Sequence, residues 1–282
     1  MPKNKPINTQ SGIIVHNYKI KISGVKKKII YHFSDLHLTE YDSFSNEAER
    51  QTAIEKSDFW KTGREYFAKT YNEPFSAEQC VDTRTHFANL LSEANKGDAL
   101  IITGDVFDYI SGANLRAADL YLKSFSKPFM AVCGNHENPK EIPNNHSFSK
   151  AKSSSQILDL GDIVVFGIDN SKGNILAEQN EQLKKAFLLE KPVIIAMHIP
   201  VMTEENKDKF EKIEEYYWLN NKSATKEVLD FIDIIKENAD KIIAVLAGHL
   251  HFMNNSEITS GVTQYVSSQA FLGNINRYEI GD

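Results

Sequence analysis

Cysteine is scarce in this chain of 282 residues, and its scarcity excludes two kinds of site. The two cysteines, Cys80 and Cys133, provide neither a disulfide framework nor the spacing of a zinc finger. Cys133 ends an apolar run, as a small apolar residue does. We therefore expect a protein of a reducing compartment, with a cytoplasmic location.

Long apolar runs and an excess of positive charge are also missing. No window approaches about 18 consecutive apolar residues, and the start of the sequence lacks the apolar core of a signal peptide. The 32 lysines and arginines are outnumbered by 38 aspartates and glutamates, which gives a formal net charge of -6. A chain with this balance has no long-range field that attracts nucleic acid or an anionic membrane. We expect a small-molecule partner and no membrane association.

What the sequence does contain is a series of five apolar runs of strand type, each associated with histidine, aspartate or asparagine. Ligands of open α/β sheets bind at the carboxyl ends of the strands. We therefore expect the polar side chains at the ends of these runs to share one site. The runs and their residues are 28–33 with Asp35 and His37, 101–108 with Asp105 and Asp108, 129–133 with Asn135 and His136, 193–197 with His198, and 242–247 with His249 and His251.

The spread of these runs bears on domain organisation. They extend from residue 28 to residue 251, so one site draws on nearly the whole chain, and we expect residues 1–282 to form a single domain. Residues 40–96 are long for a connection between strands and have helical spacing at 46–62 and 77–94, the latter N-capped by Ser76. We interpret 40–96 as a helical insertion over one face of a sheet, with part of it a candidate lid or specificity element.

The remaining elements follow from periodicity and turn residues. Hairpins are predicted where two alternating runs flank a short turn, and helices where apolar residues recur every three or four positions. The predicted hairpins join 12–22 to 27–33 and 156–160 to 163–168, the helices cover 113–125, 176–189 and 225–238, and strands within 257–267 complete a second sheet.

The polar residues form a ligand set for metal ions. It combines four imidazoles (His37, His198, His249 and His251), two carboxylates (Asp35 and Asp105) and the amide of Asn135. Mixed nitrogen and oxygen ligands suit divalent Mn, Fe, Zn, Co or Ni. Seven ligands are too many for one tetrahedral site, whereas two ions about 3.5 to 4 Å apart account for the number and fit metal-assisted phosphoryl chemistry.

These motifs, in this order, resemble those of the calcineurin-like metallophosphoesterase superfamily. The resemblance rests on Asp35-x-His37, Gly104-Asp105-x-x-Asp108, Gly134-Asn135-His136-Glu137, His198 and Gly248-His249-x-His251. It implies a four-layer α/β sandwich in which two mixed β-sheets are flanked by helices. It also implies that Asp35, His37, Asp105 and His251 hold a first metal, and that Asp105, Asn135, His198 and His249 hold a second.

The resemblance assigns two further residues to catalysis. His136 matches the family's non-ligand histidine that faces the phosphate, and Asp108 matches the carboxylate that pairs with it. Such a carboxylate offsets the effect of nearby cations and keeps the imidazole protonated, as a general acid requires. The alternative for Asp108 is an exposed turn carboxylate. Glu137 is expected to be a structural hydrogen-bonding residue.

Other residues have two interpretations. His32 is expected in the core, because alternation turns it away from the site, and His146 is either a loop residue or a substrate contact. The aromatic residues 216–218 either pack beneath a helix or form an apolar wall for the leaving group.

The expected substrate is a small phosphodiester such as a cyclic nucleotide or a glycerophosphodiester. Tyr109 and Asn138 stand where the serine/threonine phosphatase branch has phosphate-binding arginines, which argues against a phosphoprotein phosphatase and removes a clamp for a second phosphate charge. The alternatives are a phosphomonoesterase, a nuclease, which the net charge disfavours, and a non-catalytic scaffold, which the full set of ligands and His136 disfavour.

Overall fold

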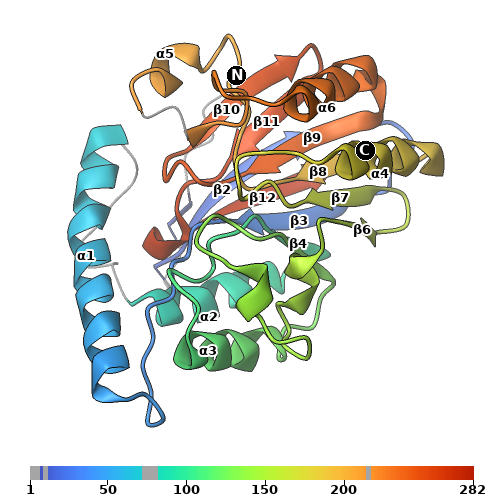
Figure 1. Ribbon diagram of the computed structural model, residues 1–282. Coiled ribbons are helices and arrows are strands. Elements are labelled where there is room, and N and C mark those ends of the chain that lie inside the picture. Colours follow the sequence, from blue (N-terminus) through green and yellow to red (C-terminus); the bar gives the residue numbers. More distant parts are fainter. Residues whose placement is uncertain (1–6, 9–11, 72–81, 214–216) are drawn as a thin grey trace.

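The computed structural model describes residues 7–8, 12–71, 82–213 and 217–282, whose strands form two six-stranded sheets (Figure 1). The first sheet has the order β1 (Ile7–Asn8), β2 (Ile14–Ile20), β12 (Asn274–Ile280), β3 (Lys28–Phe33), β4 (Ala99–Ile102) and β5 (Phe129–Ala131). The second has the order β10 (Asn254–Thr259), β11 (Val262–Val266), β9 (Ile242–Ala247), β8 (Val193–Ala196), β7 (Val164–Ile168) and β6 (Ser155–Asp159).

Both sheets mix parallel and antiparallel pairs. Strands β3, β4 and β5 are parallel, as are β7, β8, β9 and β11. Of these strands, β3, β4, β5, β8 and β9 precede the candidate ligands, and β4, β8 and β9 are buried along their whole length. Strands covered on both faces have continuous apolar sequences, which explains why the runs are so clear in the sequence.

Helices cover the outer face of each sheet. The helices of the described chain are α1 (Glu47–Tyr71), α2 (Thr83–Ala94), α3 (Gly112–Leu122), α4 (Ala177–Ala186), α5 (Lys207–Phe210) and α6 (Lys226–Glu237), with 3₁₀ turns at Pro139–Glu141, Ser149–Lys152, Phe187–Leu189, Ala239–Lys241 and Ala270–Leu272. Helices α2 and α3 pack on the first sheet, and α4 and α6 on the second. The resulting order of helices, sheet, sheet and helices confirms the predicted four-layer α/β sandwich.

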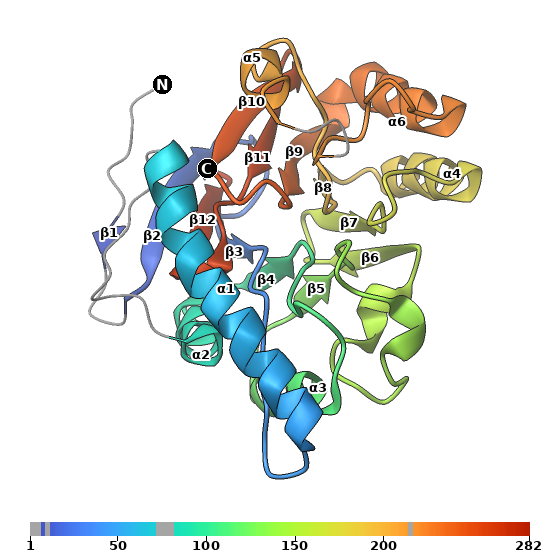
Figure 2. The same cartoon turned by 60° about the vertical axis from the view of Figure 1, so that its left-hand side comes forward.

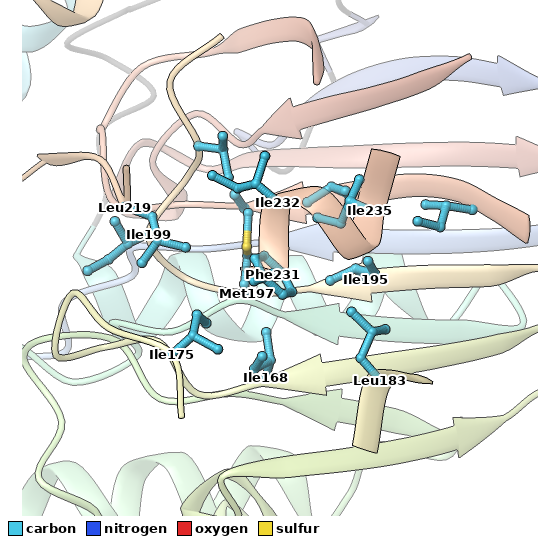
Figure 3. Close-up of a cluster of buried hydrophobic side chains, with 14 of the residues drawn as sticks. Ile168, Ile175, Leu183, Ile195, Met197, Ile199, Leu219, Phe231, Ile232 and Ile235 are labelled. Carbon is cyan, nitrogen blue, oxygen red and sulfur yellow. The ribbon is translucent and has the colours of Figure 1, made fainter. Parts of the chain in front are cut away.

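Side chains alternate between two apolar layers along each central strand. In β4, Leu100 and Ile102 face the helices of the first sheet, whereas Ile101 faces the space between the sheets. Figure 3 shows the outer layer of the second sheet, where Ile195 of β8 packs near Phe231 of α6. A fully buried side chain of this kind contributes about 1.5 to 3 kcal/mol, and the two layers hold the strand ends in register.

Most predicted elements are confirmed. The 156–168 hairpin is the antiparallel pair of β6 and β7. The predicted helices correspond to α3, α4 and α6, and the strands of 257–267 are β10 and β11. Helix α6 begins after the extended Thr225 and ends at Asn238, the predicted limits.

The predicted hairpin between 12–22 and 27–33 is wrong. Strand β12 lies between the two strands, parallel to β2 and antiparallel to β3. Tyr278 and Ile280 of β12 fill the layer between the sheets, so the central position goes to a buried strand from far along the chain. The turn at Ser23 and Gly24 therefore bridges two strand spacings, about 10 Å.

The 40–96 segment divides into two helices with different positions. Helix α2 covers the first sheet, as expected, and is N-capped by Asp82, which accepts a hydrogen bond from Thr85 N. Ser76, Ala77 and Cys80 lie outside the described residues. Helix α1 is longer than predicted and stands apart from both helix layers, across the rim where the site lies (Figure 2). Among the described residues, no helix is both long and apolar enough to span a membrane.

Candidate metal centre

The turns that carry the candidate ligands have strained backbones. Six non-glycine residues of the described chain have positive φ, and five of them are candidate ligands: Asp35 (59°), His37 (50°), Asp105 (50°), His249 (73°) and His251 (55°). This conformation costs about 1 to 3 kcal/mol per non-glycine residue and concentrates at functional sites. Hydrogen bonds hold the turns, because Leu36 N and His37 N both donate to Asp105 O.

Glycines allow the turns to approach each other. A Cβ atom at Gly134 would lie 2.2 Å from Asp105 Oδ1, and one at Gly248 would lie 1.9 Å from Ser34 Oγ. Neither contact is sterically possible. The glycines of these motifs are therefore required by packing between neighbouring turns.

The structure brings the first predicted ligand group together. One donor atom from each of Asp35, His37, Asp105 and His251 lies within 4.8 Å of the others. His37 Nε2 is 3.1 Å from His251 Nε2, and His251 Nε2 is 3.3 Å from Asp35 Oδ1. All four residues are buried except His251, whose side chain is 12% exposed.

The second group shares Asp105 with the first. Donor atoms of Asp105, His198 and His249 again lie within 4.8 Å of one another. His198 Nε2 is 3.3 Å from Asp105 Oδ2 and 2.9 Å from Asn135 Oδ1. The other ring nitrogen of His198, Nδ1, donates to Thr103 O at 2.7 Å, which directs Nε2 to the centre.

The two neighbouring imidazoles of the second group, His198 and His249, have pKa values shifted in opposite directions. Burial disfavours protonation of His198, but the Asp105 carboxylate outweighs it and raises the pKa of His198 to about 10. Burial, together with the charge of His198, lowers the pKa of His249 to about 3. His249 is therefore neutral, and its buried Nε2 has no hydrogen-bond partner in the described chain.

These residues fit a pair of divalent cations. A buried polar nitrogen without a partner costs about 1 to 3 kcal/mol, and a cation beside His249 Nε2 removes that cost. Imidazole nitrogens and carboxylate oxygens within a few ångströms of one another are also the ligands that borderline divalent metals select. The clusters are thus compatible with a dinuclear site.

Comparison with known proteins identifies the family of this chain. A family model described as calcineurin-like phosphoesterase matches residues 29–253. The chain belongs to this family. No curated protein sequence matches it. The match confirms the resemblance seen in the motifs and makes the chain a metal-dependent phosphoesterase.

The fold is shared with a solved structure of low sequence identity, and further structures are similar to a smaller extent. A dimetal phosphatase from Danio rerio superposes with a TM-score of 0.54 at 10% identity, over 86% of this chain and 88% of that one. A purple acid phosphatase from yellow lupin (Lupinus luteus) has a TM-score of 0.49 at 12% identity, over 90% of this chain and 46% of that one. A putative 5′-nucleotidase from Staphylococcus aureus has a TM-score of 0.44 at 13% identity, over 87% and 49%.

In this phosphoesterase, His136 and Asp108 lie together as the motifs predict. His136 Nδ1 is 2.8 Å from Asp108 O and 3.3 Å from Asp108 Oδ1. Burial opposes protonation of His136, but Asp108 and the charge of Asp105 outweigh it and raise its pKa to about 9. Asp108 is only 5% exposed, so the alternative of an exposed turn carboxylate is wrong.

Glu137 ties the turns together. Its carboxylate accepts hydrogen bonds from Gly134 N (2.6 Å), Asp105 N (2.9 Å) and Phe107 N (3.0 Å). It is buried, and all three bonds go to backbone groups. The structural interpretation of Glu137 is confirmed.

Sequence reasoning missed two residues of α1 that reach the centre. Trp60 stacks on His37, with ring centroids 4.2 Å apart and planes at 29°, and its Nε1 donates to Asp108 Oδ1 at 3.0 Å. Lys56 Nζ lies 3.4 Å from Asp108 Oδ2. The sequence pattern that could have indicated these residues is weak. Among the α1 side chains that the structure describes, the buried residues are Ala53 and Trp60, which are seven positions apart.

A cavity of about 530 Å³ opens above the centre. Its floor includes Asp105, Asp108, Asn135, His136, His249 and His251. Its walls come from α1, from Ile213 and Tyr217, and from Leu250 and Phe252. Part of the 40–96 segment, the candidate lid or specificity element, therefore lines the cavity.

The positions of the residues with two sequence interpretations show which of them lie in the core and which line the cavity. His32 is fully buried and 2.8 Å from Thr103 Oγ1, which confirms the core interpretation. His146 bonds to Leu115 O and Phe148 N and is not among the cavity residues. Of the aromatic segment, Trp218 packs in the core and Tyr217 lines the cavity, whereas Tyr216 lies outside the described residues.

Proposed function

We propose that the chain hydrolyses a small phosphodiester with two divalent cations, of Mn, Fe, Zn, Co or Ni. Asp35, His37, Asp105 and His251 would hold the first cation, and Asp105, Asn135, His198 and His249 the second. The observation that carries the proposal is that the two groups share the Asp105 carboxylate. When bound, two such cations supply a nucleophile from water at neutral pH and offset negative charge on phosphorus.

The protein's own acid would be His136. Its Nδ1 faces two oxygens of Asp108, so that nitrogen carries a fixed proton. Nε2 then carries the proton that can move, and His136 borders the cavity. A positioned acid of this kind donates to the leaving oxygen and contributes about 10² to 10⁴ in rate.

A diester, such as a cyclic nucleotide or a glycerophosphodiester, suits the charges of the cavity. Lys56 is the only lysine or arginine among the described residues that line it. A phosphomonoester carries a second negative charge, which favours a bidentate arginine. The net charge of -6 also argues against a nuclease, and the presence of His136 with all seven ligands argues against a scaffold.

Domain organisation and location belong to the same proposal. We propose that residues 1–282 form a single domain, because the ligands come from both sheets, and that 40–96 is an insertion in it. The scarcity of cysteine supports a cytoplasmic location.

Metal content and hydrolysis test the function together. We expect the purified protein to bind two Mn²⁺ and to hydrolyse bis(p-nitrophenyl) phosphate faster than p-nitrophenyl phosphate. Asp233→Asn on α6, an exposed carboxylate paired with Lys236, is the matched control and should change neither property. A protein that binds no metal and stays inert in Mn²⁺ would overturn the proposal, and a faster monoester would reverse the substrate preference.

A further inference from the structure

Exposed aromatic rings border the cavity. Phe59 and Tyr66 of α1 are 63% and 64% exposed and still line it. Tyr217 lines it from a segment far away in the sequence, and its ring lies 5.2 Å from that of His249 on the floor. Large aromatic side chains that face a cavity above a catalytic centre are typical of a ligand site.

The shape of these side chains indicates the ligand. A flat heterocycle stacks on aromatic rings and gains about 1 to 3 kcal/mol per base, whereas a glycerol substituent keeps its hydroxyl groups hydrated and gains little. Lys56 adds a cation next to Asp108, within reach of an oxygen of the same substrate.

We propose that this cavity binds the flat heterocyclic substituent of a phosphodiester, of the nucleoside type, between α1 and Tyr217. Lys56 contacts a phosphate oxygen. This assignment rests on the proposed phosphodiesterase function and selects between its two substrate classes.

A comparison of two substrates tests the subsite. In Mn²⁺, kcat/KM for 3′,5′-cyclic AMP should exceed that for glycerophosphocholine at least about tenfold, the equivalent of 1.4 kcal/mol. Phe59→Ala and Tyr217→Ala should each reduce this ratio about tenfold, and Tyr217→Phe should preserve it. The control is Leu229→Ala, an exposed leucine on α6, which should leave both rates unchanged.

The possible outcomes separate the subsite from the function. Equal rates on both substrates, with a ratio unaffected by either alanine variant, would overturn the subsite and leave the phosphodiesterase function standing. No hydrolysis of either compound or of bis(p-nitrophenyl) phosphate would overturn the function. Calorimetric titration of both compounds then still decides the subsite, because it requires cyclic AMP to bind more tightly.

A second inference concerns Trp60 and stands on a separate observation. The Trp60 indole covers one face of the His37 ring, and Asp108 Oδ1, which accepts the Trp60 N–H, is also 3.3 Å from His37 Nδ1. The two contacts brace the face and one edge of the imidazole. They leave Nε2 directed at Asp105 and His251.

The geometry points to Trp60 as a positioning residue for the first cation site. Partners that orient a ligand change metal affinity about 10- to 100-fold when they are removed. We expect Trp60→Ala to weaken the first site by this factor and to leave the second unchanged. Trp60→Phe keeps a ring on His37 and should recover part of the affinity.

Intrinsic fluorescence provides a signal that does not depend on catalysis. The chain has two tryptophans, and Trp218 packs in the core next to Phe210. In Trp218→Phe, Trp60 is the single tryptophan, so with selective excitation of tryptophan Co²⁺ at the first site should quench its emission. His37→Ala should weaken this quenching. Calorimetry then compares Trp60→Ala with Trp218→Phe. Two unchanged affinities in Trp60→Ala would overturn the inference.

Discussion

The two ligand groups share one carboxylate but differ in backbone and in cover. Every residue of the first group has positive φ, whereas in the second only Asp105 and His249 do. The first group lies beneath Trp60 and Phe271, and the second includes the exposed Asn135 and opens to the cavity beside Tyr217. The comparison indicates a first site largely covered by aromatic rings next to a second site that is more open to the cavity.

The largest effect is expected from a substitution of Asp105, the carboxylate that the two groups share. Asp105→Asn should release both cations and lower kcat by at least about 10³-fold, the upper range for loss of one electrostatic contact. His37→Ala should empty mainly the first site. Metal analysis of both purified variants distinguishes these results, and equal loss at both sites in each variant would contradict a shared Asp105.

Substitutions of the neighbouring residues Asn135 and His136 should impair the enzyme in different ways. Asn135→Ala should lower metal content and slow all substrates alike. His136→Ala should retain both cations, and its defect, about 10² to 10⁴-fold, should grow as the leaving group becomes more basic. Asp108→Asn should resemble a milder His136→Ala. The measurement is kcat across aryl and alkyl esters of increasing leaving-group pKa.

The same series separates two roles for His136. If the His136→Ala defect is identical for p-nitrophenol and for an alkyl alcohol, His136 binds phosphate and does not donate the proton.

The smallest expected effect is a pH dependence of folding stability that comes from His32, outside the metal centre. Burial lowers the pKa of His32 to about 3 in the folded protein, from the ordinary 6.5. The folded state therefore binds fewer protons than the unfolded state below pH 6.5, so this stability is complete above that pH and is lost on acidification. At pH 5.5 the loss is about 1.4 kcal/mol.

Urea unfolding of metal-free protein at pH 7.5 and 5.5 measures this loss. His32→Asn should lose about 1.4 kcal/mol less than the wild type between the two pH values. An identical pH dependence in the two proteins would mean that His32 is not the acid-sensitive group of the fold.

The sequence was most informative where one strand determines both fold and site. The run before His198 and the run before His249 are buried on both faces, so each appears as a continuous apolar stretch that stops just before a ligand. Their convergence could be predicted because parallel strands end at a common rim.

Two features could not be predicted in this way. The place of β12 between β2 and β3 depends on pairing between segments far apart in the chain, and alternation within each strand is the same for any partner. Trp60 was not predicted because α1 is polar along most of its length, and a single buried ring gives no periodic pattern.

The place of β12 also sets an order of events during synthesis. Residues 274–280 leave the ribosome after every strand of the second sheet, so that sheet can form while the first still lacks a central strand. Ala270 N and Phe271 N, just before β12, donate to Ser34 O and Asp35 O, beside the first ligand group. The nascent chain therefore completes the turn of Asp35 and His37 late, and metal capture at this site follows translation of nearly all the residues that surround it.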